Sequence, residues 1–468
     1  MKFKNGLFIF HRDLRLQDNM GLVELNKICE NIYPCFIFTP EQVGSKNPYR
    51  SFNAVQFMIE SLDELSKTIM NNSGRLIILY GDQIHMVHRL AKDLDINVVA
   101  FNRDYTPYAI SRDKKTLDSC NERGIACYSF SDYYMFEPGT IINSLGNAYK
   151  KFTPFYTETV AKNVKPNLSG KITRFRAESR VLPYEIELKS AKALFTQNNP
   201  DILVHGGRIN GLKRLQAACK EQSEYDERRD FFMTKTTHLS AYIKFGCVSI
   251  REVYHAFKKT FGIQHGLIRE LIWREFFAHI LYAYPNVVGQ SYQPRYRSIE
   301  WVNNKTAFEK WQNGLTGFPL VDACMRELNK TGYMHNRGRM VVASFLIKTL
   351  LIDWRWGEKY FAQKLTDYDL ASNNGNWQGI SGTGVDMKPY FRDMNPWIQS
   401  IKYDKYAEYI KKWVPELSEV AAADIHRWHE RYDRPEYNNI QYPRPIVDYA
   451  KQKVMMLSLY DNAHTNKT

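Results

Sequence analysis

The spacing of apolar residues changes once along this chain, near Asp201, and that change limits the folds open to it. Before that point, short apolar runs rich in β-branched and aromatic residues alternate with stretches at helical spacing, such as 55–69 and 87–94. The short runs are Leu7–Phe10, Tyr33–Phe38, Leu76–Tyr80, Val98–Phe101 and Cys127–Phe130. Strands that alternate with helices predict a parallel, doubly wound sheet.

Beyond Asp201 the strand signals nearly vanish, and long amphipathic helical patterns follow at 267–284, 320–328 and 339–351. Between the two parts, prolines, lysines and glycines accumulate and the periodicity fades. We therefore predict an α/β domain at 1–132, a connector at 133–200 that packs on both neighbours, and a larger all-α domain at 201–468.

The chain has 468 residues and a formal net charge of +14. Its basic residues are dispersed rather than gathered in a tail, which favours a folded surface that binds nucleic acid. The alternative is that this charge serves only solubility.

Seven cysteines without C-x-x-C pairs, and no histidines at metal spacing, predict neither a disulfide framework nor a metal site. The longest apolar region, 340–352, is interrupted by polar residues and is too short to span a bilayer. The chain also opens without a signal-peptide pattern. We expect a protein that is not in the membrane and lies in the cytoplasm, or in the nucleus if its source is eukaryotic.

Hydroxyl side chains gather where a helix is expected to start, at Thr236, Thr237 and Ser240. Together with free backbone N–H groups they can hold a diphosphate; the alternative is a plain helix cap. In the next helical pattern, Glu270, Trp273, Arg274 and Phe277 recur at three- and four-residue spacing. They form either one wall of a substrate site or a core tryptophan beside a surface ion pair.

The segment T-G-Y-M-H-N-R-G-R-M places hydrogen-bond donors at another helix start, on Asn336, Arg337 and Arg339, with Met340 beside them. Arginines there oppose the helix dipole unless they serve an anionic partner. Arg339 can pair with Asp367 or Asp369, which precede an Asn-Asn-Gly turn. We expect something anionic nearby.

Three tryptophans, Trp311, Trp354 and Trp377, fall in separate helical patterns. Indole is among the side chains easiest to oxidise, so a spaced series can carry charge from a buried cofactor to solvent. The alternative is that all three are core residues. Trp377 follows Asp367 and Asp369 closely, a grouping that suits a flat heterocycle beside an indole.

Several long motifs occur in an order that resembles the photolyase and cryptochrome family, most closely its class I cyclobutane pyrimidine dimer photolyases. They are F-H-R-D-L-R-L-Q-D-N at 10–19, N-R-D-Y-T-P-Y at 102–108, E-L-I-W-R-E-F, W-x-x-G-x-T-G-F-P, M-H-N-R-G-R-M and D-Y-D-L-A-S-N-N-G-N-W. The resemblance covers nearly the whole chain. It implies that the helical domain binds FAD.

The resemblance also assigns roles to single residues. It implies that the FAD phosphates lie at Tyr225, Thr236, Thr237, Leu239 and Ser240, and the ribitol and ring at Asp367 and Asp369, with Arg339 paired to Asp367 and Asn373 facing flavin N5. Photoreduction would pass through Trp377, Trp354 and Trp311, in that order. Substrate and DNA contacts would fall to Glu270, Trp273, Arg274, Asn336, Arg337, Met340 and Arg392.

The activity implied is light-driven repair of DNA containing pyrimidine dimers, by electron transfer from excited reduced flavin to a flipped lesion, in a monomeric enzyme. A second, antenna chromophore is also implied. It can be a folate, a deazaflavin or a flavin, and the candidate residues for its site leave the choice open: Gln56, Asn102, Arg103 and Asp104. A cryptochrome-type photoreceptor is the alternative; within the resemblance, Asn336, Met340 and Asn373 favour dimer repair.

One position departs from the family pattern. Class I enzymes typically read W-Q-W, whereas this chain has Trp377, Gln378 and Gly379. Aromatic stacking on a base contributes about 1–3 kcal/mol. In the family, the second tryptophan of this motif stacks on the flipped dimer. Its absence here would weaken dimer binding or shift recognition toward a related lesion or a single strand, unless Trp397 or Tyr390 replaces it.

Overall fold

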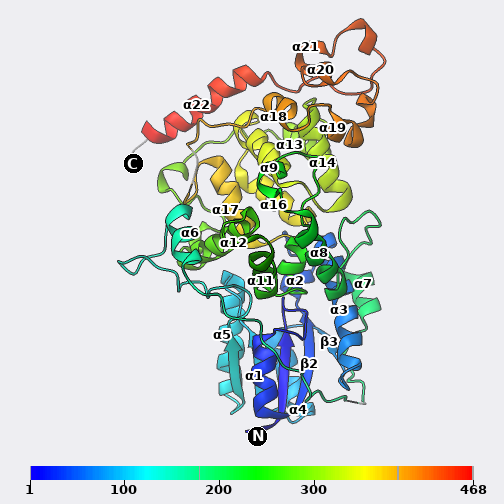
Figure 1. Ribbon diagram of the computed structural model, residues 1–468, viewed down its shortest axis with the longest axis vertical. Helices are drawn as coiled ribbons and strands as arrows, with labels where there is room; N and C mark the ends of the chain where they lie inside the picture. The colour runs from blue at the N-terminus through cyan, green and yellow to red at the C-terminus, as the bar shows by residue number, and fades with distance from the viewer. Residues whose placement is uncertain (1, 179, 387–388, 466–468) are drawn as a thin grey trace.

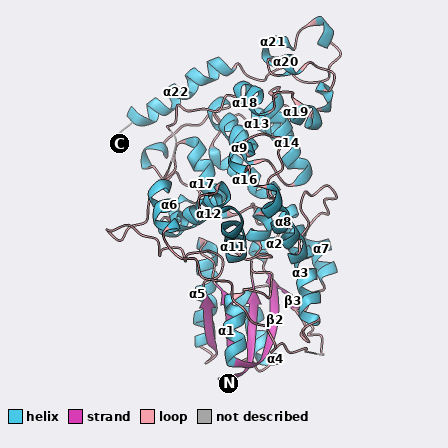
Figure 2. Cartoon of the chain, in the orientation of Figure 1, coloured by secondary structure: helices cyan, strands magenta, loops and turns pink. Residues whose placement is uncertain are grey.

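The computed structural model describes residues 2–178, 180–386 and 389–465. The chain folds into an α/β part that contains the N-terminus and a helical part that contains the C-terminus (Figure 1). The strands of the sheet gather at one end of the molecule, and helices make up most of the rest (Figure 2). No helix among the described residues is both long and apolar enough to cross a membrane.

The sheet has five strands in the order β3-β2-β1-β4-β5, and each neighbouring pair is parallel. The strands are β1 (Phe3–Phe10), β2 (Cys29–Phe38), β3 (Ile77–Tyr80), β4 (Val98–Asn102) and β5 (Ala126–Phe130). Each overlaps one of the short apolar runs, although β1 and β2 begin earlier than predicted, at Phe3 and Cys29. The predicted fold class is confirmed.

Helices cover both faces of the sheet, because successive strand residues point to opposite sides. Phe8 and Phe10 of β1 belong to a core with Leu22 of α1 (Met20–Ile28) and Leu62 of α3 (Phe52–Met70). Leu7 and Ile9 belong to a second core. Its helical residues come from α4 (Gln83–Asp93) and α5 (Pro107–Asn121). A strand buried on both faces is the reason that β1 reads as a continuous apolar run.

The segment expected to connect the domains contacts both of them. Its first helix, α6 (Phe152–Val160), packs on α12 (Gly266–Ala283) of the helical part, and α7 (Leu188–Phe195) packs on α3. Between these helices, Ile32 of β2 exchanges backbone hydrogen bonds with Arg174 and Arg176.

The helical part is built from short and medium helices. Besides α12 they are α8 (Arg208–Glu221), α9 (Tyr225–Arg228), α10 (Ser240–Lys244), α11 (Ile250–Phe261), α13 (Lys305–Asn313), α14 (Pro319–Thr331), α15 (Asn336–Ser344), α16 (Trp354–Lys364), α17 (Leu370–Ser381), α18 (Pro396–Tyr403), α19 (Glu408–Trp413), α20 (Ala422–Ile425), α21 (Trp428–Arg431) and α22 (Tyr449–Thr465). The pattern at 339–351 predicts one helix, but α15 ends at Ser344 and a π-helical turn follows at Phe345–Thr349.

Helix α17 packs against α12, α15 and α16. Two glycines allow this close approach. A Cβ on Gly375 of α17 would lie 2.2 Å from the ring of Phe277, and one on Gly357 of α16 would lie 2.1 Å from the indole of Trp377. The contacts hold α17 at the centre of the helical part.

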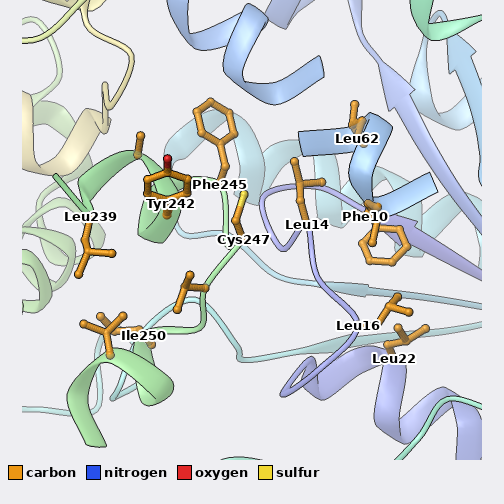
Figure 3. Close-up of a cluster of buried hydrophobic side chains, with 14 of the residues drawn as sticks. Phe10, Leu14, Leu16, Leu22, Leu62, Leu239, Tyr242, Phe245, Cys247 and Ile250 are labelled. Carbon is orange, nitrogen blue, oxygen red and sulfur yellow. The ribbon is translucent and has the colours of Figure 1, made fainter. Parts of the chain in front are cut away.

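The loop after β1 joins the two parts through apolar contacts. Leu14 and Leu16 belong to the same buried cluster as Tyr242, Phe245 and Cys247 of the helical part (Figure 3). The backbone N–H of Leu14 also donates to the carbonyl of Phe245, at 3.0 Å. The C-terminal end of the sheet is thereby fixed against the helices that carry the predicted site.

Candidate cofactor and substrate cavities

Two cavities share a wall that is formed by residues of α15 and α17. The small cavity, of about 140 Å³, is lined by residues that include Arg339, Asp367, Asp369, Asn373 and Trp377. The large cavity, of about 550 Å³, is lined by residues that include Glu270, Trp273, Arg274 and Gly379. Both are lined by Asn336, Met340, Ser372, Asn376 and Ile380. A group in one cavity therefore lies beside a group in the other.

Asp367 is the carboxylate that pairs with Arg339. Its Oδ2 lies 3.0 Å from Nη2 of Arg339 and accepts a hydrogen bond of 2.6 Å from the hydroxyl of Ser240. Its Oδ1 is buried and has no hydrogen-bond partner in the described part of the chain. Oδ1 is thus left to accept a hydrogen bond from a bound group.

Asp369 does not bond to Arg339; its partners come from elsewhere. It caps the N-terminus of α17, where its side chain accepts from the backbone N–H of Ser372. Its other oxygen lies 3.0 Å from Arg12 and 3.8 Å from Lys244. Burial raises the pKa of Asp369, but Lys244, Arg12 and Arg274 oppose it, and the pKa falls well below its usual range. The carboxylate is ionised near neutral pH.

Asn373 is held by a buried acid that sequence reasoning missed. Its Nδ2 donates to the carbonyl and to Oε1 of Glu358, both at 3.0 Å. Glu358 is 3% exposed. Burial raises its pKa to about 7, against the opposing hydrogen bonds of Asn373 and Tyr49. The amide orientation of Asn373 therefore depends on α16.

The three indoles lie on α13, α16 and α17, as their spacing predicts, but one of them cannot have its expected place. Trp311 is 0% exposed, and its ring centroid lies 6.4 Å from that of Trp377. A residue so buried, and in contact with the first member of the series, cannot be its exit to solvent. This correction concerns the order; Trp377 and Trp354 are themselves 2% and 1% exposed.

The large cavity brings together the residues predicted on α12. Glu270, Trp273, Arg274 and Phe277 all line it. The indole of Trp273 stacks on Phe152 of α6, with ring centroids 3.6 Å apart and an interplanar angle of 4°. Glu270 pairs with Arg229, and its pKa is raised by burial, which outweighs the opposing charges of Arg229 and Arg269. One aromatic wall of the cavity is thus rigidly supported.

Several predicted residues line neither cavity. Thr236 is within hydrogen-bond distance of the hydroxyl of Tyr333, at 3.2 Å, and Thr237 accepts from the backbone N–H of Leu239. Arg337 pairs with Asp230, and Arg392 is exposed. Of the five residues assigned to the FAD phosphates, only Ser240 is among those lining the large cavity, whereas Tyr225, Thr236, Thr237 and Leu239 are not.

The wall at Gly379 is open. This residue lines the large cavity, and a Cβ added to it would meet nothing within 4 Å. Trp397, which the sequence offers as a replacement, is not among the residues that line this cavity; it is 8% exposed and stacks on Phe318. Tyr390 stacks on Tyr460 and lines an adjoining cavity. Tyr292 lines both that cavity and the large one.

The residues considered for an antenna chromophore are engaged within the protein. Asn102 is 0% exposed and donates to Asp13 and Asn19, and Gln56 bonds to Glu60. Arg103 pairs with Glu137, and Asp104 pairs with Arg12. Nothing in these contacts selects one chromophore. In the described ranges, no group of three or more acidic, histidine or cysteine residues is placed to hold a metal ion.

Known proteins resemble the chain over almost its whole length. A model of the FAD-binding domain of DNA photolyase matches residues 267–462, and a model of DNA photolyase matches residues 7–169. A deoxyribodipyrimidine photo-lyase of Halobacterium salinarum is 34% identical, over 98% of this chain and 99% of its own length.

Solved structures agree with this relationship. A photolyase from Sulfolobus tokodaii that contains two FAD molecules superposes with a TM-score of 0.88 at 38% identity, covering 98% of this chain and 100% of that one. A class III photolyase from Agrobacterium tumefaciens gives 0.91 at 30%, covering 100% and 99%. A cryptochrome from Synechocystis gives 0.88 at 27%, covering 98% and 100%. The chain therefore belongs to the DNA photolyase family, as an enzyme of the deoxyribodipyrimidine photo-lyase type.

Proposed function

We propose that the protein repairs cyclobutane pyrimidine dimers in DNA with light, holding FAD at the small cavity and the lesion in the large one. The observation that carries this proposal is the shared wall of Asn336, Met340, Ser372, Asn376 and Ile380. Electron transfer requires that donor and acceptor lie close together, and two contiguous cavities meet that requirement.

The residues of the small cavity fit a flavin. Asp367 offers a buried acceptor, Oδ1, that lacks a protein partner among the described residues. Asn373 lines the same cavity, and its amide nitrogen is already engaged by Glu358, so its oxygen is the atom left for a donor. Reduced FAD, when bound and excited, would supply the electron that splits the dimer and would then regain it. The protein side chains bind and orient both groups and exclude water.

The large cavity fits a lesion flipped out of the duplex, as photolyases are known to require. Trp273, supported by Phe152, offers a flat face for stacking on a base. Glu270 lines the same cavity, so its carboxyl group can accept a hydrogen bond from a base N–H. Tyr292 also lines this cavity, and its backbone N–H donates to the side chain of Gln378, next to the open position of Gly379.

The route of photoreduction runs from Trp377 to Trp354 and, in our proposal, leaves through Trp301. Trp301 is partly exposed, which Trp311 is not. The residues that follow it approach the start of α16, which carries Trp354: the N–H of Val302 donates to the carbonyl of Leu351, and Asn303 accepts from the N–H of Asp353. Replacement of Trp301 with Phe should slow photoreduction, whereas Trp311→Phe should leave it nearly unchanged. Flash photolysis of the oxidised protein measures both, and the reverse ranking would restore Trp311 to the route.

For the antenna we propose a second flavin in the α/β part. The support is the Sulfolobus structure, which contains two FAD molecules and is 38% identical to this chain. Extraction of the purified protein and chromatography of the released pigments identifies the chromophore. A folate or a deazaflavin in the extract would replace this proposal.

The repair activity is tested with reduced protein and DNA carrying defined dimers, as duplex and as single strand, under blue light and in darkness. Loss of dimers only in the light supports the enzyme. Equal survival in light and darkness, from a protein that does bind FAD, would refute dimer repair and favour a photoreceptor such as the cryptochrome neighbour. A preference for the single strand would fit the open wall at Gly379.

A further inference from the structure

The loop that follows β1 extends from the sheet into the helical part. Arg12 of this loop is 7% exposed. The glycine it meets, Gly246, has a φ of +63°, and a Cβ there would lie 2.4 Å from the carbonyl oxygen of Arg12. So close a contact between two chain segments fixes where the Arg12 backbone sits relative to the helical part.

The guanidinium of Arg12 joins residues of both parts. Its Nη1 donates to Oδ2 of Asp369 at 3.0 Å, and its Nη2 donates to the hydroxyl of Tyr134 at 2.9 Å. Its Nε lies 3.3 Å from Asp104, which follows β4. Ion pairs of this kind are directional, because the planar guanidinium holds its partners at set angles.

The partner that matters most is Asp369, because it begins α17. Its Oδ1 accepts a hydrogen bond from the backbone N–H of Ser372 at 3.1 Å, and its Oδ2 accepts one from Nη1 of Arg12. A carboxylate held at both oxygens cannot rotate away from the helix end. Helix α17 carries Asn373 and Trp377, both of which line the small cavity.

The charges around Asp369 favour its ionised state. Lys244 lies 3.8 Å away, and Arg274, whose guanidinium sits 4.4 Å from the ring centroid of Tyr134, is the third nearby cation. The other anions near these cations are Asp104, which pairs with Arg12, and Glu275, which pairs with Arg274. Burial raises the pKa of Glu275 to about 7, so near neutral pH part of its charge is lost.

We propose that Arg12 is a positioning residue for the flavin site: through Asp369, the α/β part fixes the start of α17 and so the orientation of Asn373 and Trp377. This inference rests on the proposed function, because it presumes that FAD occupies the small cavity. A role confined to joining the two parts is the competing explanation.

Arg15 of the same loop serves as the matched control. It is also buried, at 2% exposure, and also joins the two parts, through Asp132 and the carbonyl of Gly246. Asp369 is not among its recorded partners. A role in joining the parts predicts the same consequences for Arg12→Lys and Arg15→Lys; a role in positioning α17 does not.

The experiment compares full-length wild type, Arg12→Gln, Arg12→Lys and Arg15→Lys for FAD affinity, for the absorption spectrum of the bound flavin and for its photoreduction rate. For Arg12→Gln we expect affinity about tenfold weaker, the size of a lost charged hydrogen bond, with an altered spectrum. Arg12→Lys should recover part of the loss. Arg15→Lys should lower the thermal midpoint and leave the flavin properties of the folded protein within about twofold of wild type.

A double-mutant cycle with Asp369→Asn tests whether Arg12 acts through that carboxylate. We expect Arg12→Gln to weaken FAD binding by less than about twofold once Asp369 is neutral. Additive effects, or wild-type flavin properties in folded Arg12→Gln, would overturn the inference. A wild-type chain that fails to bind FAD would instead overturn the proposed function.

Discussion

The two cavities differ in how firmly their walls are fixed. In the small cavity, Asp367 is held by Arg339 and Ser240, Asp369 by Arg12, and Asn373 by Glu358. In the large cavity, Trp273 is supported by Phe152, but the position of Gly379 is open. The difference indicates a site pre-organised for one resident ligand, next to a site that keeps room for a ligand that enters and leaves.

The largest effect is expected in the small cavity. Replacement of Asp367 with Ala would leave the partly buried guanidinium of Arg339 without its ion pair, at a cost of about 3 kcal/mol. We expect the purified variant to have lost most of its FAD, as measured by the flavin-to-protein absorbance ratio. Asp201→Ala, which removes an exposed acid 3.8 Å from Lys330, is the control and should keep its flavin. Full retention of FAD by Asp367→Ala would mean that the small cavity does not hold it.

Glu358 makes the stability of the folded protein sensitive to pH. Its pKa is raised to about 7 in the folded protein, above its unfolded value, so folding favours the protonated form. The stability that this group confers is fully present below the pKa of the unfolded chain, and it is lost as pH rises through about 7. The rise in pKa to about 7 corresponds to a loss of about 3 kcal/mol in the free energy of unfolding.

Glu358→Gln should remove that loss. We expect the variant to gain stability relative to wild type between about pH 5 and about pH 8 in urea unfolding followed by circular dichroism. Glu416→Gln is the comparison, since the pKa of Glu416 is lowered rather than raised and its change with pH should have the opposite sign. Identical pH profiles for wild type and Glu358→Gln would show that Glu358 is ionised throughout.

In the large cavity, Trp273 should account for more lesion affinity than any other wall. Trp273→Ala should weaken binding of dimer-containing DNA about tenfold, within the range for stacking on one base. Trp273→Phe keeps a ring on Phe152 and should lose less. Fluorescence anisotropy measures the affinity for dimer-containing DNA and for undamaged DNA. The difference between the two separates lesion binding from general binding to the DNA backbone. Equal weakening for both kinds of DNA would place Trp273 outside the lesion site.

The smallest effect is expected at Gly379. Gly379→Trp should tighten lesion binding by up to about tenfold, because the added ring enters open space beside the cavity. Gly379→Ala adds only a Cβ that meets nothing, so it should leave lesion affinity unchanged and stabilise α17 by up to about 1 kcal/mol. Unchanged affinity in Gly379→Trp would show that another residue, such as Tyr292, already forms that wall.

Sequence alone could predict the parts of this molecule that depend on local spacing. The five strands followed from short apolar runs, and the shared face of Glu270, Trp273 and Arg274 followed from their positions on one helix. The ion pair of Arg339 with Asp367 was one of two options that charge left open, and the family resemblance chose correctly between them.

Contacts between distant segments could not be predicted in this way. Arg12 and Asp369 are 357 residues apart, and no spacing rule joins a loop after a strand to a helix cap in another part. The bond between Asn373 and Glu358 crosses from one helix to its neighbour. The burial of Trp311 was one of two alternatives that spacing left open, because exposure depends on how α13, α16 and α17 pack together.

The central claim is that an electron donor in the small cavity lies beside a lesion in the large one. The most direct test is the fluorescence lifetime of the reduced flavin in the bound protein, recorded with dimer-containing and with undamaged oligonucleotides at saturating concentration. Our account predicts a lifetime shortened by the dimer alone, with dimers lost in proportion to the quenching. An unchanged lifetime on a lesion that is demonstrably bound would contradict it.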